Sequence, residues 1–197
     1  MAVGCRQYQL PNTRNSTYQP LAGATFGTLK RYMANTRKIA LHYLQHSSWS
    51  VLPAEDKELL ELAAKAAKNA YAPYSKFKVG AAIRMESGEI VPGSNQENAS
   101  FPAGICAERT ALHAAMTVLP KGEVESIAIV VPQIKGTKPV TPCGICRQAL
   151  VEQERRQKGP MRLLMGIVKG PVIETFSAET LLPLSFDSSQ LGKKKAV

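Results

Sequence analysis

The chain has 197 residues, of which 44% are hydrophobic, and this length suits one folded domain with tails better than two domains. No stretch approaches the roughly 20 consecutive apolar residues of a membrane helix, so we expect no membrane partner. A formal net charge of +10 is typical of proteins that bind nucleic acid or anionic lipid. The position of these charges in the chain argues against that interpretation.

Most of the positive charge lies at the two ends. Residues 1–50 carry six basic residues and no acidic one, and the C-terminal tail adds Lys193, Lys194 and Lys195. Residues 51–192 hold 16 basic and 15 acidic side chains, so the body of the chain is close to neutral. We therefore predict a basic extension at 1–50, a folded domain at 51–187 and a basic tail at 188–197, without a nucleic-acid partner.

The composition of the first 32 residues allows three interpretations. They are rich in Gln, Asn, Ser and Thr with scattered Arg and no acid, which fits a transit peptide, a disordered extension or an over-long reading frame whose start is Met33. No apolar core of the signal-peptide kind is present. Four cysteines are too few for a disulfide framework and suit a reducing compartment, so the sequence predicts a cytoplasmic protein.

The first predicted element of the domain is an amphipathic helix over 56–71, because its apolar residues recur at helical spacing until Pro73. Before it, the apolar run within 38–52 is a weak signal for a short edge strand. Two strand-like runs at 77–85 and 89–91 flank a Glu-Ser-Gly turn and predict a hairpin.

Helices and strands then alternate to the end of the domain. The patterns predict helices over 106–119 and 143–157, strands over 126–131, 162–168 and 172–176, and a short helix from Ala178. Only three residues separate the last two strands, so these strands must be antiparallel. We expect an α/β fold, a three-layer α/β/α sandwich around a mixed five-stranded sheet.

Three cysteines lie at the predicted starts of two helices. Cys106 opens one helix, and Cys143 and Cys146 open the other in a Pro-Cys-Gly-Ile-Cys motif. Catalytic zinc sites use three protein ligands and leave one position open, and the domain offers three cysteines without a fourth. A helix N-terminus favours the thiolate, which is the form that binds metal. The remaining cysteine, Cys5, lies in the extension and receives no role.

Charged residues accompany these cysteines. Glu108 follows Cys106 by two residues and is suited to carry protons for a zinc-activated water. Three thiolates around Zn²⁺ leave a net charge of −1, and we expect Arg109 and Arg147 to offset it by hydrogen bonds into the sulfur shell. The alternatives are a first-turn glutamate favoured by the helix dipole and two solvated arginines.

Together these motifs resemble those of the cytidine deaminases, specifically the small type that acts on free nucleosides. The similarity runs from about Asp56 to Phe186 and includes Cys106-Ala107-Glu108-Arg109 and Pro142-Cys143-Gly144-Ile145-Cys146-Arg147. These match the zinc-deaminase signature in its three-cysteine variant. The resemblance implies zinc held by Cys106, Cys143 and Cys146, catalysis by Glu108, and hydrolysis of cytidine and deoxycytidine to uridine and deoxyuridine with release of ammonia.

The resemblance also implies substrate contacts. Phe77 and Val79 would pack on the nucleoside, Asn95 and Glu97 would bind a sugar hydroxyl, and the backbone near Ala107 would hold the base. It implies a homotetramer, in which Phe186 reaches a neighbouring subunit's site. Taken alone, Phe77 and Val79 fit ordinary core positions, and 95–98 fits a polar loop.

Phe101 departs from the family pattern, which often has Tyr at this position.

Two related activities and one non-catalytic role remain as alternatives. A blasticidin-type nucleoside deaminase shares the cysteine motifs, whereas a nucleic-acid cytosine deaminase typically has His in place of Cys106 and a helical crossover between its last two strands. A zinc-stabilised binding module would not need Glu108.

Overall fold

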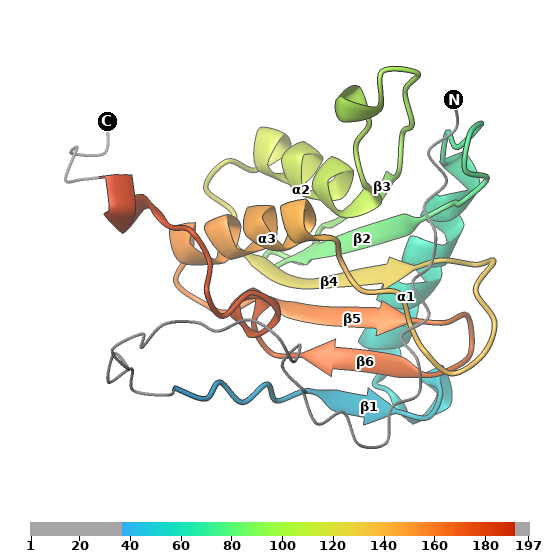
Figure 1. The fold of residues 1–197 in the computed structure, drawn as a ribbon. Coiled ribbons are helices and arrows are strands. Elements are labelled where there is room, and N and C mark those ends of the chain that lie inside the picture. Colours follow the sequence, from blue (N-terminus) through green and yellow to red (C-terminus); the bar gives the residue numbers. More distant parts are fainter. Residues whose placement is uncertain (1–36, 192–197) are drawn as a thin grey trace, which may run out of the picture. The chain divides into compact units, whose positions relative to one another are not determined.

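The computed structural model describes residues 37–191 (Figure 1). Six strands form one sheet in the order β1-β6-β5-β4-β2-β3. Their bounds are β1 Leu44–His46, β2 Gly80–Met85, β3 Ile90–Ser94, β4 Val124–Val130, β5 Arg162–Gly166 and β6 Val172–Thr175. Only β4 and β5 pair in parallel, joined through a helical crossover, and every other neighbouring pair is antiparallel. The predicted mixed sheet and the antiparallel last two strands are confirmed.

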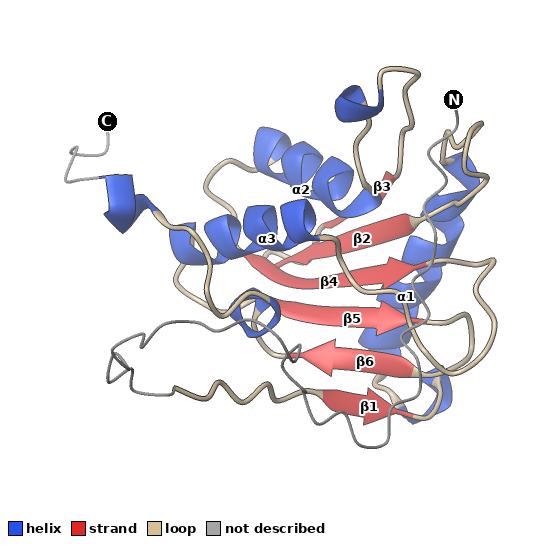
Figure 2. Ribbon diagram, viewed as in Figure 1, coloured by secondary structure: helices blue, strands red, loops and turns tan. Residues whose placement is uncertain are grey.

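Three α-helices cover the two faces of the sheet. These are α1 at Ala54–Ala66, α2 at Ala107–Val118 and α3 at Gly144–Arg156. Figure 2 shows α2 and α3 on one face and α1 on the other. No α-helix within residues 37–191 is long and apolar enough to cross a membrane.

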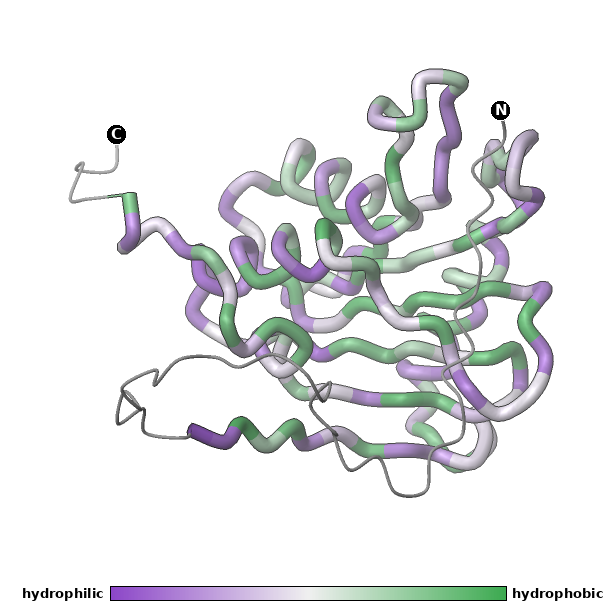
Figure 3. The backbone as a smooth tube through the Cα atoms, viewed as in Figure 1, coloured by the Kyte–Doolittle hydropathy of each residue, from purple (hydrophilic) through white to green (hydrophobic). Residues whose placement is uncertain are grey.

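Successive side chains of the central strands point to opposite faces of the sheet and form two apolar cores. Ile127 and Ile129 of β4 face α2 and α3, whereas Ala128 and Val130 face α1. A strand with apolar residues on both faces is covered on both faces, and Figure 3 shows this apolar character along most of β4 and β5. The predicted three-layer arrangement follows from these two cores.

The predicted count of five strands is wrong, because β1 adds a sixth. His46 of β1 bonds Glu174 of β6, with Nε2 and Oε2 2.8 Å apart. The other carboxylate oxygen of Glu174 accepts from Arg162, which also reaches the buried Asp56 of α1. This charged cluster and the buried Trp49 attach part of the predicted extension to the sheet. The division at 1–50, 51–187 and 188–197 otherwise remains a prediction, and most of 1–50 lies outside the described residues.

A second difference concerns Phe77 and Val79, which were predicted to lie in a strand. In the structure β2 begins only at Gly80, and residues 77–79 precede it without sheet pairing. The side chain of Asn95 holds this segment: its Oδ1 accepts from Val79 N at 2.7 Å and its Nδ2 donates to the Phe77 carbonyl at 2.9 Å. The backbone N–H of Asn95 also donates to the Val79 carbonyl at 3.2 Å, so both the side chain and the backbone of Asn95 anchor the segment.

Gly93 allows α2 to approach β3 closely. A Cβ atom at this position would lie 2.4 Å from the backbone nitrogen of Ala111 and 2.7 Å from the carbonyl oxygen of Ala107. Both atoms belong to the helix backbone and cannot move aside alone. The first turn of α2 therefore depends for its position on the missing side chain of Gly93.

We predict that Gly93→Ala destabilises the fold by about 2 kcal/mol, because overpacking forces the helix away from the sheet. For a domain of this size the melting temperature should fall by roughly 6 °C, which differential scanning calorimetry can measure. Gly159→Ala is the matched control, since the nearest atom to its added Cβ would be 3.9 Å away. An unchanged melting temperature for Gly93→Ala would show that α2 does not depend on this contact.

Candidate zinc centre

The N-termini of α2 and α3 bring the three predicted cysteine ligands together. Cys106 is the residue preceding α2, Cys143 precedes α3, and Cys146 lies in the first turn of α3. Cys143 follows β4 through the loop that joins this strand to α3.

The spacing of the three sulfur atoms fits one zinc ion. Cys143 Sγ lies 3.9 Å from Cys106 Sγ and 3.5 Å from Cys146 Sγ, and all three lie within 4.8 Å of one another. Tetrahedral zinc with Zn–S bonds of about 2.3 Å needs sulfur atoms about 3.8 Å apart. Three soft thiol ligands in this geometry favour zinc over hard cations such as Mg²⁺.

The electrostatics of the cluster favour thiolate at Cys106. Its hydrogen bond with Cys146, and then those with Cys143 and Arg109, lower the pKa of Cys106 to about 5, against the effect of burial. The same contact with Cys106, reinforced by burial, raises the pKa of Cys146. Zinc binds cysteine as the thiolate, so zinc binding would displace any protons held by the three sulfur atoms.

The two predicted arginines behave differently. Arg109 faces the sulfur atoms: although burial acts in the opposite direction, hydrogen bonds with Cys146 and Cys106 raise the pKa of its guanidinium. Arg147 instead donates to three oxygen atoms, namely the carbonyls of Pro142 and Leu181 at 2.8 and 3.1 Å and the Thr141 hydroxyl at 3.2 Å. Arg147 therefore holds the loop before Cys143 rather than the sulfurs, because its helix position directs it toward that loop.

Glu108 lies beside the sulfur cluster in the first turn of α2, with only 5% of its surface exposed. Burial raises the pKa of its carboxyl group, and the negative charge of Cys106 acts in the same direction. A raised pKa suits a group that must both accept and release a proton near neutral pH. Ala107, also buried, is the first residue of the helix, where the amide N–H has no acceptor within the helix.

The predicted sugar-binding residues lie opposite the segment before β2. Glu97 Oε2 accepts from the backbone N–H groups of Tyr74 and Ser75 at 2.9 and 3.3 Å, and its Oε1 accepts from the Ser75 hydroxyl. These hydrogen bonds lower the pKa of Glu97 despite the opposing effect of desolvation. Asn95 holds the same segment through Phe77 and Val79, so both residues border the place where these two side chains lie.

Ser75 is a contributor that the sequence analysis missed. Its side chain accepts from the N–H of Phe77 at 2.9 Å, a serine turn of the kind that Ser forms with the residue two positions on. The sequence signal was the Tyr-Ser pair between Pro73 and Phe77, which is typical of a turn but does not indicate that its hydroxyl reaches Glu97.

Phe101 and Phe186, both discussed in the sequence analysis, are exposed at the surface. Phe101 packs edge-to-face against Tyr74 with ring centroids 6.0 Å apart, so its departure from the family's tyrosine preserves an aromatic contact. Phe186 has 54% of its surface exposed, while its carbonyl oxygen accepts from Gln148 of α3 at 2.9 Å. The backbone near Phe186 is therefore held in place and its ring projects from the surface.

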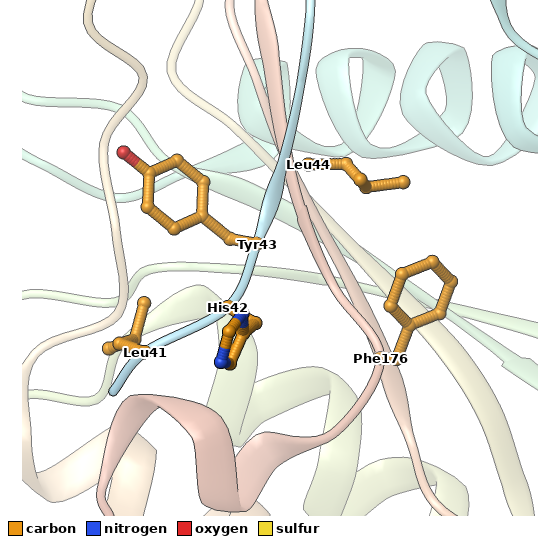
Figure 4. Close-up of a pocket in the computed structure, with 5 residues that line it drawn as sticks. All are labelled: Leu41, His42, Tyr43, Leu44 and Phe176. Atoms are coloured by element: carbon orange, nitrogen blue, oxygen red, sulfur yellow. The ribbon is translucent and has the colours of Figure 1, made fainter. Parts of the chain in front are cut away.

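A surface pocket of about 290 Å³ lies elsewhere, at the β1 edge of the sheet (Figure 4). Leu41, His42, Tyr43, Leu44 and Phe176 line it. His42 is its one ionisable group besides the tyrosine, and the lining has no carboxylate or thiol. The chemistry of the cysteine cluster, rather than the size of a hollow, therefore identifies the candidate site.

Comparison with known proteins agrees with this geometry. Residues 53–158 match the model of the "Cytidine and deoxycytidylate deaminase zinc-binding region". That span covers more than half of the chain and includes all three clustered cysteines and Glu108. The chain belongs to this deaminase family.

Individual relatives extend the match over most of the domain. A cytidine deaminase of Halalkalibacterium halodurans is 39% identical over 68% of this chain and 96% of its own length, and one of Sporosarcina psychrophila is 38% identical over 69% and 94%. The crystal structure of cytidine deaminase from Burkholderia pseudomallei has a TM-score of 0.58 at 38% identity, covering 68% of this chain and 100% of its own. The fold and the zinc-binding region of this deaminase-family chain are therefore shared with these proteins.

For this member of the deaminase family we predict that Cys143→Ser loses bound zinc. Serine is a poor zinc ligand in place of a thiolate, and the two remaining cysteines cannot complete the site. Metal analysis of the purified protein should give about one zinc per chain before the substitution and far less after it. Cys5→Ser is the control, expected to retain its zinc; full zinc in Cys143→Ser would refute the three-thiolate site.

Proposed function

We propose that this protein hydrolyses cytidine and deoxycytidine to uridine and deoxyuridine, releasing ammonia. The observation that carries the proposal is the buried Glu108 beside three convergent cysteines, within a domain that belongs to the deaminase family. The relatives named above as cytidine deaminases support the choice of a free nucleoside. We place the reaction in pyrimidine salvage and the protein in the cytoplasm.

The residues of the site divide the chemistry between them. Cys106, Cys143 and Cys146 would hold zinc, which when bound supplies the Lewis acidity that makes water nucleophilic near neutral pH. Glu108 accepts a proton from the attacking water and delivers it to N3 of the cytosine ring. The water oxygen forms a bond to C4, and the C4–N4 bond breaks as Glu108 transfers the second proton to the departing amine. Water and cytidine thus give uridine and ammonia.

Binding groups surround this reaction centre. The N–H of Ala107, which has no acceptor within α2, would hold the base, and Phe77 and Val79 would supply apolar contacts for its ring. The carboxylate of Glu97 and the amide of Asn95 are suited to sugar hydroxyls, which both donate and accept hydrogen bonds. Arg109 stabilises the thiolates.

A nucleic-acid cytosine deaminase is the less favoured alternative. The antiparallel pairing of β5 and β6 argues against the helical crossover of that class, and Cys106 occupies the position of its usual histidine. A blasticidin-type deaminase is disfavoured by the Asn95 and Glu97 contacts, which suit a ribose. Substrate turnover distinguishes all three.

The deciding experiment follows ammonia release from cytidine, deoxycytidine, blasticidin and a cytosine-bearing oligonucleotide with zinc-loaded protein. We expect turnover of the two nucleosides, and activity confined to the oligonucleotide or to blasticidin would overturn the proposal. Glu108→Gln should lower kcat for cytidine by about 10²–10⁴-fold, the usual contribution of a positioned acid–base group, while zinc content stays unchanged. Undiminished turnover in Glu108→Gln would remove Glu108 from the mechanism.

We also propose that the protein is a homotetramer with shared active sites. Support comes from the exposed ring of Phe186 on a backbone held by Gln148 and Arg155 of α3. An exposed aromatic ring on an ordered backbone is typical of residues that contact a partner.

Sedimentation equilibrium should give four times the 21.4 kDa chain mass. Phe186→Ala should weaken cytidine binding without loss of zinc, because the ring contributes to a neighbour's site. Phe176→Ala, a similarly exposed ring at the β1 edge, is the control. A fully active monomer would contradict the proposal.

A further inference from the structure

A small hydrogen-bond network joins residues 74–77 to Glu97, and the donor and acceptor of each bond can be assigned. This assignment identifies a further functional residue. Ser75 stands at their centre. Its hydroxyl contacts both the N–H of Phe77 and the carboxylate of Glu97, which come from the two segments that border the proposed nucleoside site.

The direction of each hydrogen bond follows from the groups involved. The Phe77 N–H can only donate, so the Ser75 oxygen accepts it at 2.9 Å. An ionised carboxylate can only accept, so the single hydroxyl proton of Ser75 points to Oε1 of Glu97. The hydroxyl therefore has one arrangement that satisfies both partners, and rotation to any other loses a contact.

The Glu97 carboxylate has few positions left at which to accept a further hydrogen bond. A carboxylate offers about four lone-pair positions, and three donors already occupy this one: the Tyr74 N–H, the Ser75 N–H and the Ser75 hydroxyl. One acceptor position is left for an incoming group. The carboxylate is thus held ready to accept a single hydrogen bond.

Backbone strain accompanies this arrangement. Lys76 adopts φ of 58°, a left-handed conformation that is uncommon for a residue with a side chain. Its N–H donates to the Ala72 carbonyl at 3.1 Å, and its own carbonyl accepts from Gln133 at 3.3 Å. Such strain persists where surrounding contacts impose it, and Lys76 lies between the two residues, Ser75 and Phe77, that the Ser75 hydroxyl joins.

We propose that Ser75 is a positioning residue for sugar recognition, orienting Glu97 toward the 2′- or 3′-hydroxyl of the nucleoside. The inference rests on the proposed function, since it assigns a sugar hydroxyl to the last acceptor position of Glu97. Ser75 itself is exposed, so its side chain is not needed to fill a core. Removing the hydroxyl should affect binding and leave folding intact.

The test compares nucleosides with and without the 2′- and 3′-hydroxyls. Ser75→Ala should raise KM for cytidine about tenfold with little change in kcat, as expected for losing a hydrogen bond to a charged group. It should leave kcat/KM for 2′,3′-dideoxycytidine unchanged, because that substrate lacks the 2′- and 3′-hydroxyls between which Glu97 would choose. Equal losses for both substrates, or no loss for either, would overturn the inference.

Three variants separate positioning from general damage. Ser75→Thr keeps the hydroxyl and should restore KM to within about twofold of the original, while Ser87→Ala, on the β2–β3 turn, should change nothing. In a Glu97→Ala background, Ser75→Ala should add no further loss, because the two residues act as one unit. An additive loss would show that Ser75 acts independently of Glu97. Zinc content and melting temperature should be unchanged in Ser75→Ala.

A binding measurement distinguishes this inference from the proposed function. Absence of cytidine turnover in the unmodified chain would overturn the proposed function alone. Calorimetric binding of uridine and 2′,3′-dideoxyuridine needs no turnover. Ser75→Ala should weaken uridine about tenfold and leave dideoxyuridine unaffected. Equal affinities of the original and Ser75→Ala proteins for uridine would overturn the role of Ser75.

Discussion

The meeting of two helix N-termini is the constraint on which the rest of the site depends. Cys106 and Cys143 each precede the first residue of a helix, where free N–H groups and the helix dipole favour negative charge. The sheet determines where these helices start, because α2 lies against β3 at Gly93 and α3 follows β4. The sulfur atoms of Cys106 and Cys143, which are 37 residues apart in sequence, therefore come within 3.9 Å of each other.

Helix α3 extends this organisation beyond the metal centre. Its first turn carries Cys146, while Gln148 and Arg155 further along bond the carbonyl of Phe186 and Arg155 also bonds the side chain of Glu179. Arg147 secures the loop before Cys143 and the end of the short helix at Leu181. One helix thus holds both the sulfur cluster and the aromatic segment proposed to reach another subunit.

Local sequence patterns predicted the elements that depend on local physics. The three α-helices, the hairpin and the antiparallel pairing of the last two strands follow from apolar periodicity and turn residues, and the three cysteines predicted as metal ligands lie in one cluster. The failures share a cause. β1 is stabilised by His46 and Glu174, which are 128 residues apart, so only a weak signal was visible in 38–52. Phe77 and Val79 have a strand-like pattern, but β2 begins only at Gly80, and Asn95 holds the preceding segment through its side-chain amide and one backbone hydrogen bond to Val79. Ser75 was missed because a serine turn looks the same whether or not a carboxylate lies beside it.

The small residues of α2 limit how this site can be redesigned. Ala107, Ala111 and Ala115 are fully buried, and Gly93 has no side chain to remove, so no truncation on that side would enlarge the space for a bulkier pyrimidine. The large side chains of the proposed nucleoside site are Phe77, Val79 and Phe186, and trimming them would give room for a larger base. Libraries intended to broaden the range of bases should therefore vary these positions and keep the inner face of the helix unchanged.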